Sequence, residues 1–217
     1  MSLYVLGKGM EFPPPELADE DGLLAVGGDL SMERLLLAYR SGIFPWYENS
    51  YILWWCPNPR FVLFPDKLKI SSSMKQVIKR GEFEFSTNRD FNGVISSCKS
   101  VCRKGQEGTW ITDDMRKAYL NLHEHGYAHS AEAWQNGKLV GGLYGVRMGK
   151  IFFGESMFST VSNASKFAFI SYVQLLIAEG VKLIDCQVYT AHLESLGAGM
   201  IPRERFLEYV KKMTDDS

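Results

Sequence analysis

Three apolar-rich stretches in the second half of the chain are separated by short polar turns. The pattern predicts a meander of three strands, with sequences AHSAEAWQ (128–135), KLVGGLYGVRM (138–148) and KIFFGESMF (150–158). Turns are expected at Asn136-Gly137 and Met148-Gly149, because asparagine and glycine suit the backbone of tight hairpin turns. A long apolar helix, NASKFAFISYVQLLIAEG, follows and ends at Gly180, and KLIDCQVY reads as a buried strand.

Shorter elements surround this block. The expected strands are FVLFP and FEFST, and the expected helices are SSSMKQVIKR, NRDFNGVISSCKSVCRK, ITDDMRKAYLNLHEHG, HLESLGA and PRERFLEYVKKM. Serine residues can cap the first of these helices. Thr112 is the predicted N-cap of the third helix and Gly126 its terminator, because a side-chain oxygen at the start and a glycine at the end are helix boundary signals.

The first sixty residues have a different character. Prolines and acidic residues in EFPPPELADEDGLLAVGGDLS predict an extended entry with a turn at Gly27 and Gly28. Asp29 or Ser31 can cap the helix MERLLLAYRS, which Gly42 should end. The aromatic and proline-rich segment GIFPWYENSYILWWCPNPR predicts neither a regular helix nor a regular strand. We place a domain boundary near Arg60, which gives a small domain over 1–60 and a larger one over 61–217.

The order of the elements indicates the fold class. A three-stranded meander followed by a helix and another strand is an acetyltransferase-like plan, which joins a β-meander to a βαβ unit. We therefore expect an α/β fold of the α+β type, with a central mixed sheet in the larger domain. An acyl-CoA-dependent N-acyltransferase is one function that follows. That chemistry usually needs a glycine-rich loop to hold the pyrophosphate, whereas TVSNASK, after GESMFS, contains no glycine.

Composition excludes several classes of protein. The chain has 217 residues and a formal net charge of −1, so it is not a globally basic nucleic-acid binder, although a local basic patch remains compatible. No apolar run approaches the ~20 residues that span a membrane, and the N-terminus is not that of a secretory signal. The four cysteines and four histidines lack zinc-site spacings. We expect no metal, and reduced thiols in the cytoplasm.

A set of motifs carries a resemblance that spans roughly residues 12 to 212. The motifs are GLLAVGGDLS, LLLAYRSGIFPW, LWWCPNPR, EGTWIT, LVGGLYGV, FGESMFS, NASK, LIDCQV and SLGAGMIPR. In this order they resemble the leucyl/phenylalanyl-tRNA–protein transferase family. The resemblance implies a cytoplasmic bacterial enzyme that moves Leu, Phe or Met from charged tRNA to a protein's N-terminal amine. The modified protein becomes a substrate for degradation through the N-end rule. It also implies a small N-terminal domain and a larger acetyltransferase-like (GNAT) domain.

Asp185 and Gln187 are the first candidate catalytic residues. They lie two apart in KLIDCQVY, so in a strand both point to one face while Cys186 points to the other. The resemblance implies a relay in which Asp185 orients the Gln187 NH2 group and the Gln187 oxygen accepts a hydrogen bond from the amine. The alternative is a structural polar pair at a strand end. Ester aminolysis is downhill, so neither ATP, a metal nor another cofactor is expected.

Glu155 is the third candidate catalytic residue. It follows the apolar run IFFG, where an unpaired buried carboxylate would cost several kcal/mol. A cationic partner offsets that cost, and the incoming protein N-terminus, with its Arg or Lys side chain in the family, supplies cations. We expect Glu155 to hold the acceptor. The alternative is a structural Lys or Arg partner such as Lys166.

Apolar residues around Glu155 match the family positions that line the pocket for the transferred side chain. These residues are Leu143, Phe152, Met157, Phe169, Tyr172 and Ile184. Phe169 and Tyr172 lie three apart on one helix face, and methionine repacks easily around different side chains. By periodicity alone, an ordinary core is the favoured interpretation of these residues.

The remaining candidates concern the tRNA. Trp46 and Trp110 match family positions that hold the terminal adenosine, where stacking on an aromatic ring is worth ~1–3 kcal/mol per base. Lys75, Lys79 and Arg80 match a helix that meets the tRNA backbone, and a solvated helix face is the alternative. We expect a monomer whose partners are aminoacyl-tRNA and acceptor proteins. A module that binds aminoacyl-tRNA without turnover is the non-enzymatic alternative.

Overall fold

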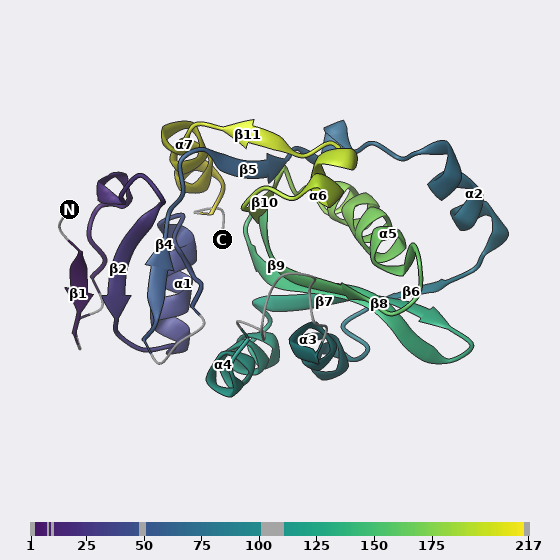
Figure 1. Cartoon of the computed structure of the whole chain (residues 1–217), viewed down its shortest axis with the longest axis horizontal. Helices are drawn as coiled ribbons and strands as arrows, with labels where there is room; N and C mark the ends of the chain where they lie inside the picture. The colour runs from purple at the N-terminus through teal and green to yellow at the C-terminus, as the bar shows by residue number, and fades with distance from the viewer. Residues whose placement is uncertain (1–2, 8, 10, 48–50, 101–110, 215–217) are drawn as a thin grey trace.

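The computed structural model describes residues 3–7, 9, 11–47, 51–100 and 111–214. Its strands form two sheets, one of four strands and one of seven (Figure 1). The mixed α/β architecture predicted from the sequence is confirmed. No helix within these ranges is both long and apolar enough to cross a membrane.

The four-stranded sheet comes from the first part of the chain. Its order is β1 (Tyr4–Leu6), β2 (Leu23–Gly27), β4 (Leu53–Trp55) and β3 (Phe44–Pro45). A 3-10 turn at Pro15–Leu17 and helix α1 (Met32–Arg40) complete this part. The sequence did not predict these strands, because each is very short and pairs with a partner distant along the chain. The Trp54 ring is fully buried here and donates its Nε1–H to the Gly27 carbonyl at 2.9 Å.

The seven-stranded sheet is mixed. In spatial order it contains β11 (Gly199–Ile201), β5 (Arg60–Leu63), β10 (Leu183–Gln187), β9 (Ile151–Ser159), β8 (Lys138–Met148), β7 (Ala128–Gln135) and β6 (Glu84–Thr87). The predicted meander β7-β8-β9 is confirmed, and helix α5 (Ala164–Ala178) connects β9 to its parallel neighbour β10. All other neighbouring pairs in this sheet are antiparallel.

Helices cover both faces of the larger sheet. Helix α5 packs on one face together with α2 (Ser72–Arg80), whereas α3 (Phe91–Ser100) and α4 (Asp113–Glu124) pack on the other (Figure 1). Two clusters of buried apolar residues follow this division. The α5-side cluster is confined to the larger sheet and its helices, but the α4-side cluster also includes α1 and β2. The division at Arg60 therefore separates the two sheets but not their cores, and it stays a prediction.

The chain ends with a short helix, α6 (Ala191–Ser195), strand β11, and helix α7 (Arg203–Met213), which packs against the end of α1. Gly42, which ends α1 with φ +73°, shows how closely the two helices pack. A Cβ atom added at Gly42 would lie only 2.6 Å from the Leu207 side chain. The left-handed glycine predicted at this position is confirmed.

Local signals placed most helix and turn boundaries correctly. Ser31, Ser71 and Thr112 each accept a hydrogen bond from the backbone N–H three residues on, as N-caps do. Asn136 and Gly137 both have positive φ, as a two-residue hairpin turn requires. These features depend on a few neighbouring residues, which explains why the sequence shows them.

Candidate active site

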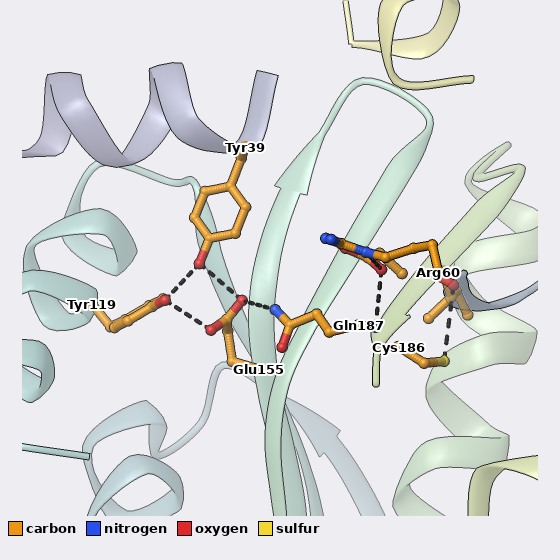
Figure 2. Close-up of polar contacts among 8 residues, drawn as sticks. Tyr39, Arg60, Tyr119, Glu155, Cys186 and Gln187 are labelled. Atoms are coloured by element: carbon orange, nitrogen blue, oxygen red, sulfur yellow. Dashed lines mark hydrogen bonds and ion pairs between the residues drawn. The ribbon is translucent and has the colours of Figure 1, made fainter. Parts of the chain in front are cut away.

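Glu155 lies at an irregularity in strand β9, where the pairing with β8 shifts register between Tyr144 and Gly145. Its carboxylate is only 8% exposed and accepts three hydrogen bonds of 2.8 Å each. The donors are the hydroxyls of Tyr39 from α1 and Tyr119 from α4, and the side-chain nitrogen of Gln187 from β10 (Figure 2). Four elements that are distant in sequence therefore meet at one carboxylate.

The predicted alternative for Glu155, a structural lysine or arginine, is wrong for the described residues. No ion pair joins its carboxylate to a cation there. Lys166 lies in the first turn of α5 and acts electrostatically on His192. Two tyrosines and an amide offset the cost of burial instead.

The oxygens of Glu155, Tyr39 and Tyr119 form a closed ring of contacts. The two hydroxyl oxygens lie 2.5 Å apart, and each also lies 2.8 Å from the carboxylate. Each phenol has one hydrogen to donate, so three contacts among these groups need a third hydrogen. When Glu155 is protonated, its proton supplies the third hydrogen, and one tyrosine hydroxyl then accepts from the carboxyl group instead of donating to it. Burial raises the pKa of Glu155 from 4.5 to about 7, against the lowering effect of the tyrosine and Gln187 hydrogen bonds. The ring is therefore suited to gaining and losing a proton near neutral pH.

Gln187 ends strand β10 in an unusual backbone conformation. Its φ of +62° is in the left-handed region, which costs an L-residue with a side chain roughly 1–2 kcal/mol. The pairing of β10 with β5 shifts register between Asp185 and Gln187. The β9-β10 ladder also ends here, at Phe153 and Asp185. The Gln187 side chain turns toward Glu155, and its oxygen makes no hydrogen bond to a described residue.

Asp185 does not make the side-chain contact that the sequence predicted. Its carboxylate accepts two hydrogen bonds from Arg60, at 2.8 and 2.6 Å, and one from the backbone N–H of Gln187 at 2.9 Å. The NH2 group of Gln187 is oriented by Glu155. A relay through the side chains of Asp185 and Gln187 is therefore absent, although both residues face the α4 side of the sheet and Cys186 packs on the α5 side.

Sequence reasoning missed Tyr39, Tyr119 and Arg60. Each is fully buried, although each carries a polar group. Signals were present, because Tyr39 and Arg60 lie inside the motifs LLLAYRSGIFPW and LWWCPNPR. A tyrosine on the buried face of a helix nevertheless looks like a core residue until its partner is known.

The six residues predicted to line the aminoacyl pocket lie together in the α5-side cluster. Leu143, Phe152, Phe169, Tyr172 and Ile184 are each 4% exposed or less, and Met157 is partly buried. The Phe152 and Tyr172 rings meet edge to face with centroids 5.0 Å apart. Side chains therefore fill this space, and a guest side chain needs some of them to move. Met157 is the most exposed of the six and the most adaptable.

Trp46 and the segment after Trp110 lie near each other. Tyr47, next to Trp46, contacts the Thr112 hydroxyl with its own at 3.3 Å. Trp46 is half-buried, with its ring 5.8 Å from the Trp55 ring. Trp110 lies outside the described residues. Trp54 contacts Phe12 and the Gly27 carbonyl within the N-terminal part.

A family model described as leucyl/phenylalanyl-tRNA protein transferase matches residues 62–211, and the model for its N-terminal domain matches residues 28–58. This chain belongs to the leucyl/phenylalanyl-tRNA protein transferase family. It is therefore an aminoacyltransferase.

Individual members of the family match nearly the whole chain. The leucyl/phenylalanyl-tRNA–protein transferase of Syntrophus aciditrophicus is 57% identical over 98% of this chain and 89% of its own length. The proteins of the same name from Flavobacterium johnsoniae and Christiangramia forsetii are each 54% identical over 96% of this chain, and the matches cover 99% and 100% of their lengths.

The basic residues predicted to meet tRNA are exposed in this transferase. Lys75, Lys79 and Arg80 lie on the solvent side of α2, while Met74 and Val77 face the α5-side cluster. Arg80 also contacts Glu82 at 3.4 Å, in an exposed ion pair. Such a pair is worth little in water, so these cations remain available to an anionic partner.

Two cavities lie away from the predicted aminoacyl pocket. One, of about 360 Å³, is lined by Arg40, His129 and Arg147 among others, and one of about 490 Å³ by Asp19, Asn58 and Arg203 among others. Among the described residues, no group of three or more histidine, cysteine or acidic side chains is arranged to hold a metal ion.

Proposed function

We propose that this transferase moves leucine, phenylalanine or methionine from charged tRNA to the N-terminal α-amine of proteins that begin with arginine or lysine, marking them for degradation. Family membership supports the transfer. The observation that carries the proposal is the Gln187 side chain. The Gln187 nitrogen donates a hydrogen bond to Glu155, and the Gln187 oxygen is left for a substrate. An amide held in this way can accept a hydrogen bond from the attacking amine without competing for its proton.

In the proposed reaction, the lone pair of the neutral amine attacks the ester carbonyl carbon and a C–N bond forms. The bond from that carbon to the ribose oxygen breaks, and the oxygen leaves as a hydroxyl after taking the proton that the amine gives up. An amine that arrives as an ammonium ion must first release another proton. Its pKa is about 7.7–8.0, close to the value of about 7 for Glu155. Glu155 is therefore suited to hold the ammonium group and take that proton.

We place the transferred side chain in the α5-side cluster and the terminal adenosine on Trp46 and Trp110. Movement of Met157 would admit leucine, phenylalanine or methionine, since a methionine side chain adopts many shapes at low cost. We assign the larger sheet to the acetyltransferase-like (GNAT) class, on the support of its meander and the parallel β9-α5-β10 unit. The cations of α2 would contact the tRNA backbone, with a salt-sensitive contribution.

We further propose a monomer that acts in the cytoplasm, with no metal or other cofactor. The free, buried thiols of Cys56 and Cys186 are compatible with a reducing compartment.

A transfer assay tests the proposed function. Purified protein is mixed with Phe-tRNA and a peptide that begins with arginine, and the products are read by mass spectrometry. We expect the peptide to gain an N-terminal phenylalanine, and the same peptide with an acetylated N-terminus to remain unchanged. Binding of Phe-tRNA without product would indicate a binding module, and acetylation of the peptide from acetyl-CoA would indicate an acyl-CoA-dependent enzyme.

Replacing Trp46 with alanine tests the adenosine site. If the ring stacks on the terminal base, Trp46→Ala should weaken the binding of an aminoacyl-adenosine mimic such as puromycin by roughly 1–3 kcal/mol. Calorimetry measures the affinity and thermal melting measures the fold. Tyr51→Ala is a suitable control, because Tyr51 is an aromatic residue of the same region that is 71% exposed. Unchanged affinity together with earlier melting would show that Trp46 is a packing residue.

A further inference from the structure

Arg60 is the most enclosed cation near the candidate active site. Its side chain is 0% exposed, and two of its nitrogens donate to the two oxygens of Asp185, at 2.8 and 2.6 Å. The guanidinium also lies over two aromatic rings, 4.6 Å from the centre of Phe44 and 4.4 Å from that of Phe206. Phe44 belongs to β3 of the N-terminal sheet and Phe206 to helix α7. The Arg60 side chain is therefore held by contacts from β10, from β3 of the N-terminal sheet and from helix α7.

The carboxylate that Arg60 holds also fixes the backbone of Gln187. One oxygen of Asp185 accepts both the Arg60 Nε–H and the Gln187 backbone N–H, the latter at 2.9 Å. This second contact spans the point where β10 changes register and Gln187 takes its φ of +62°. A left-handed residue that is not glycine persists only where its surroundings hold it. The Asp185 carboxylate is the group that does so here.

The conformation of Gln187 in turn sets the direction of its side chain. From this turn the amide reaches Glu155, with a nitrogen–oxygen distance of 2.8 Å. A chain of direct contacts thus runs from Arg60 through Asp185 and the Gln187 backbone to the Gln187 amide. Reactions that depend on alignment are sensitive to it, since a misplacement of about 1 Å can cost on the order of 10²-fold in rate.

Stability alone is a poor reason for this arrangement. A buried ion pair often stabilises a fold no better than apolar side chains of the same volume, because both charges lose their hydration. The Arg60 pair carries a further cost, because its Nη1 is buried without a hydrogen-bond partner in the described part of the chain. What the pair supplies, and apolar side chains do not, is a fixed orientation for the Asp185 carboxylate.

We propose that Arg60 is a positioning residue for aminoacyl transfer. Its two-pronged contact orients Asp185, which holds the left-handed turn that aims the Gln187 amide at the acceptor amine. Phe44 and Phe206 keep the guanidinium in place. The position of the reacting groups therefore depends on how the N-terminal sheet and α7 pack against the larger sheet. The inference rests on the proposed function through one step, the contact of Gln187 with the amine.

Arg60→Lys tests the proposal, because lysine keeps the charge but cannot make the two-pronged contact. We expect kcat for transfer from Phe-tRNA to an arginine-initiated peptide to fall at least about tenfold, with KM for the tRNA within about twofold of wild type. Arg34→Lys is the matched control. Arg34 is equally buried, at 0% exposed, but pairs with Asp29 and the backbone of the N-terminal segment. It should leave kcat within about twofold, even where melting is earlier.

A double-mutant cycle separates positioning from a general loss of structure. If Arg60 acts through the Gln187 amide, Arg60→Lys should cost less than about a further twofold once Gln187→Ala is present. Multiplicative losses would overturn the proposal, as would an unchanged kcat in folded Arg60→Lys. If Arg60→Lys does not fold, Phe206→Leu takes its place in the cycle, because it removes one of the two rings that contact the guanidinium. Phe206→Leu should then also cost less than about a further twofold once Gln187→Ala is present. Absence of transfer by the wild-type protein would instead refute the proposed function.

Discussion

Replacing Gln187 with alanine is expected to lower the turnover number at saturating Phe-tRNA by roughly tenfold or more, with little change in tRNA affinity. The side chain contacts Glu155 within the protein, and its oxygen would contact only the reacting amine. An interaction of that kind contributes to kcat rather than to binding. Single-turnover rates and filter-binding affinities for Phe-tRNA measure the two quantities separately.

Two further variants isolate the side chain from the backbone. Gln187→Gly should lose as much turnover as Gln187→Ala, although glycine adopts a φ near +62° without strain. Val188→Ala changes the neighbouring residue, which is 42% exposed, and should retain normal turnover. If Gln187→Ala turns over at the wild-type rate, the amide has no part in the reaction. A loss in the alanine variant that glycine restores would assign the effect to the backbone.

The second large effect is expected from Glu155→Gln. This change should weaken the use of arginine- and lysine-initiated peptides most, because the carboxylate is proposed to hold both their α-ammonium group and their side-chain cation. Alanine-initiated peptides, which lack the side-chain cation, should be affected less. The fold should survive. A glutamine can donate from its nitrogen to one tyrosine oxygen and accept at its oxygen from the other tyrosine and from Gln187. It therefore supplies the third hydrogen that the ring of Glu155, Tyr39 and Tyr119 needs.

The pH dependence of kcat/KM for the acceptor should also change in Glu155→Gln. In the wild type, kcat/KM for the acceptor should rise through about pH 7 as Glu155 ionises, and fall above about pH 8, where the acceptor loses the ammonium charge that Glu155 is proposed to hold. Glu155→Gln should lose the rise near pH 7 and should instead rise near about pH 8, as the neutral amine forms. Initial rates with arginine-, lysine- and alanine-initiated peptides between about pH 6 and pH 9 measure both. Glu132→Gln is the control, since Glu132 is another fully buried carboxylate, bound by Ser86 and Ser130.

The stability of the folded protein should also depend on the ionisation of Glu155, and it should fall as the pH rises. The pKa of Glu155 is raised in the folded state, from 4.5 to about 7, so the folded protein binds the proton more tightly than the unfolded chain. Its contribution to stability is full below about pH 4.5 and is lost as the pH rises through about 7, by on the order of 3 kcal/mol. Glu155→Gln should lack this loss. Equal rate losses on all three peptides, together with a large fall in melting temperature, would contradict the acceptor role.

Some features of the site could be found in the sequence because they need no partner from elsewhere. Gln187 and Asp185 stand out as polar residues at the end of one apolar strand, and Glu155 as a charge within another, and the family motifs point to the same positions. Their contacts could not be found in this way. The family resemblance implies that Asp185 orients the Gln187 amide, but the turn at Gln187 directs that amide to Glu155, 32 residues away in the chain. A local pattern contains no information about which distant side chain a strand end meets.

By itself the sequence determined the helix caps, the Asn136-Gly137 hairpin, the meander and the apolar helix α5, because these depend on interactions among residues a few positions apart. It also determined the family, through motifs along the whole chain. Only the tertiary structure decided that Tyr39 meets Glu155 across 116 positions and Arg60 meets Asp185 across 125. Such contacts exist only once separate sheets and helices have packed, and a buried polar group takes whichever partner that packing brings within hydrogen-bond distance.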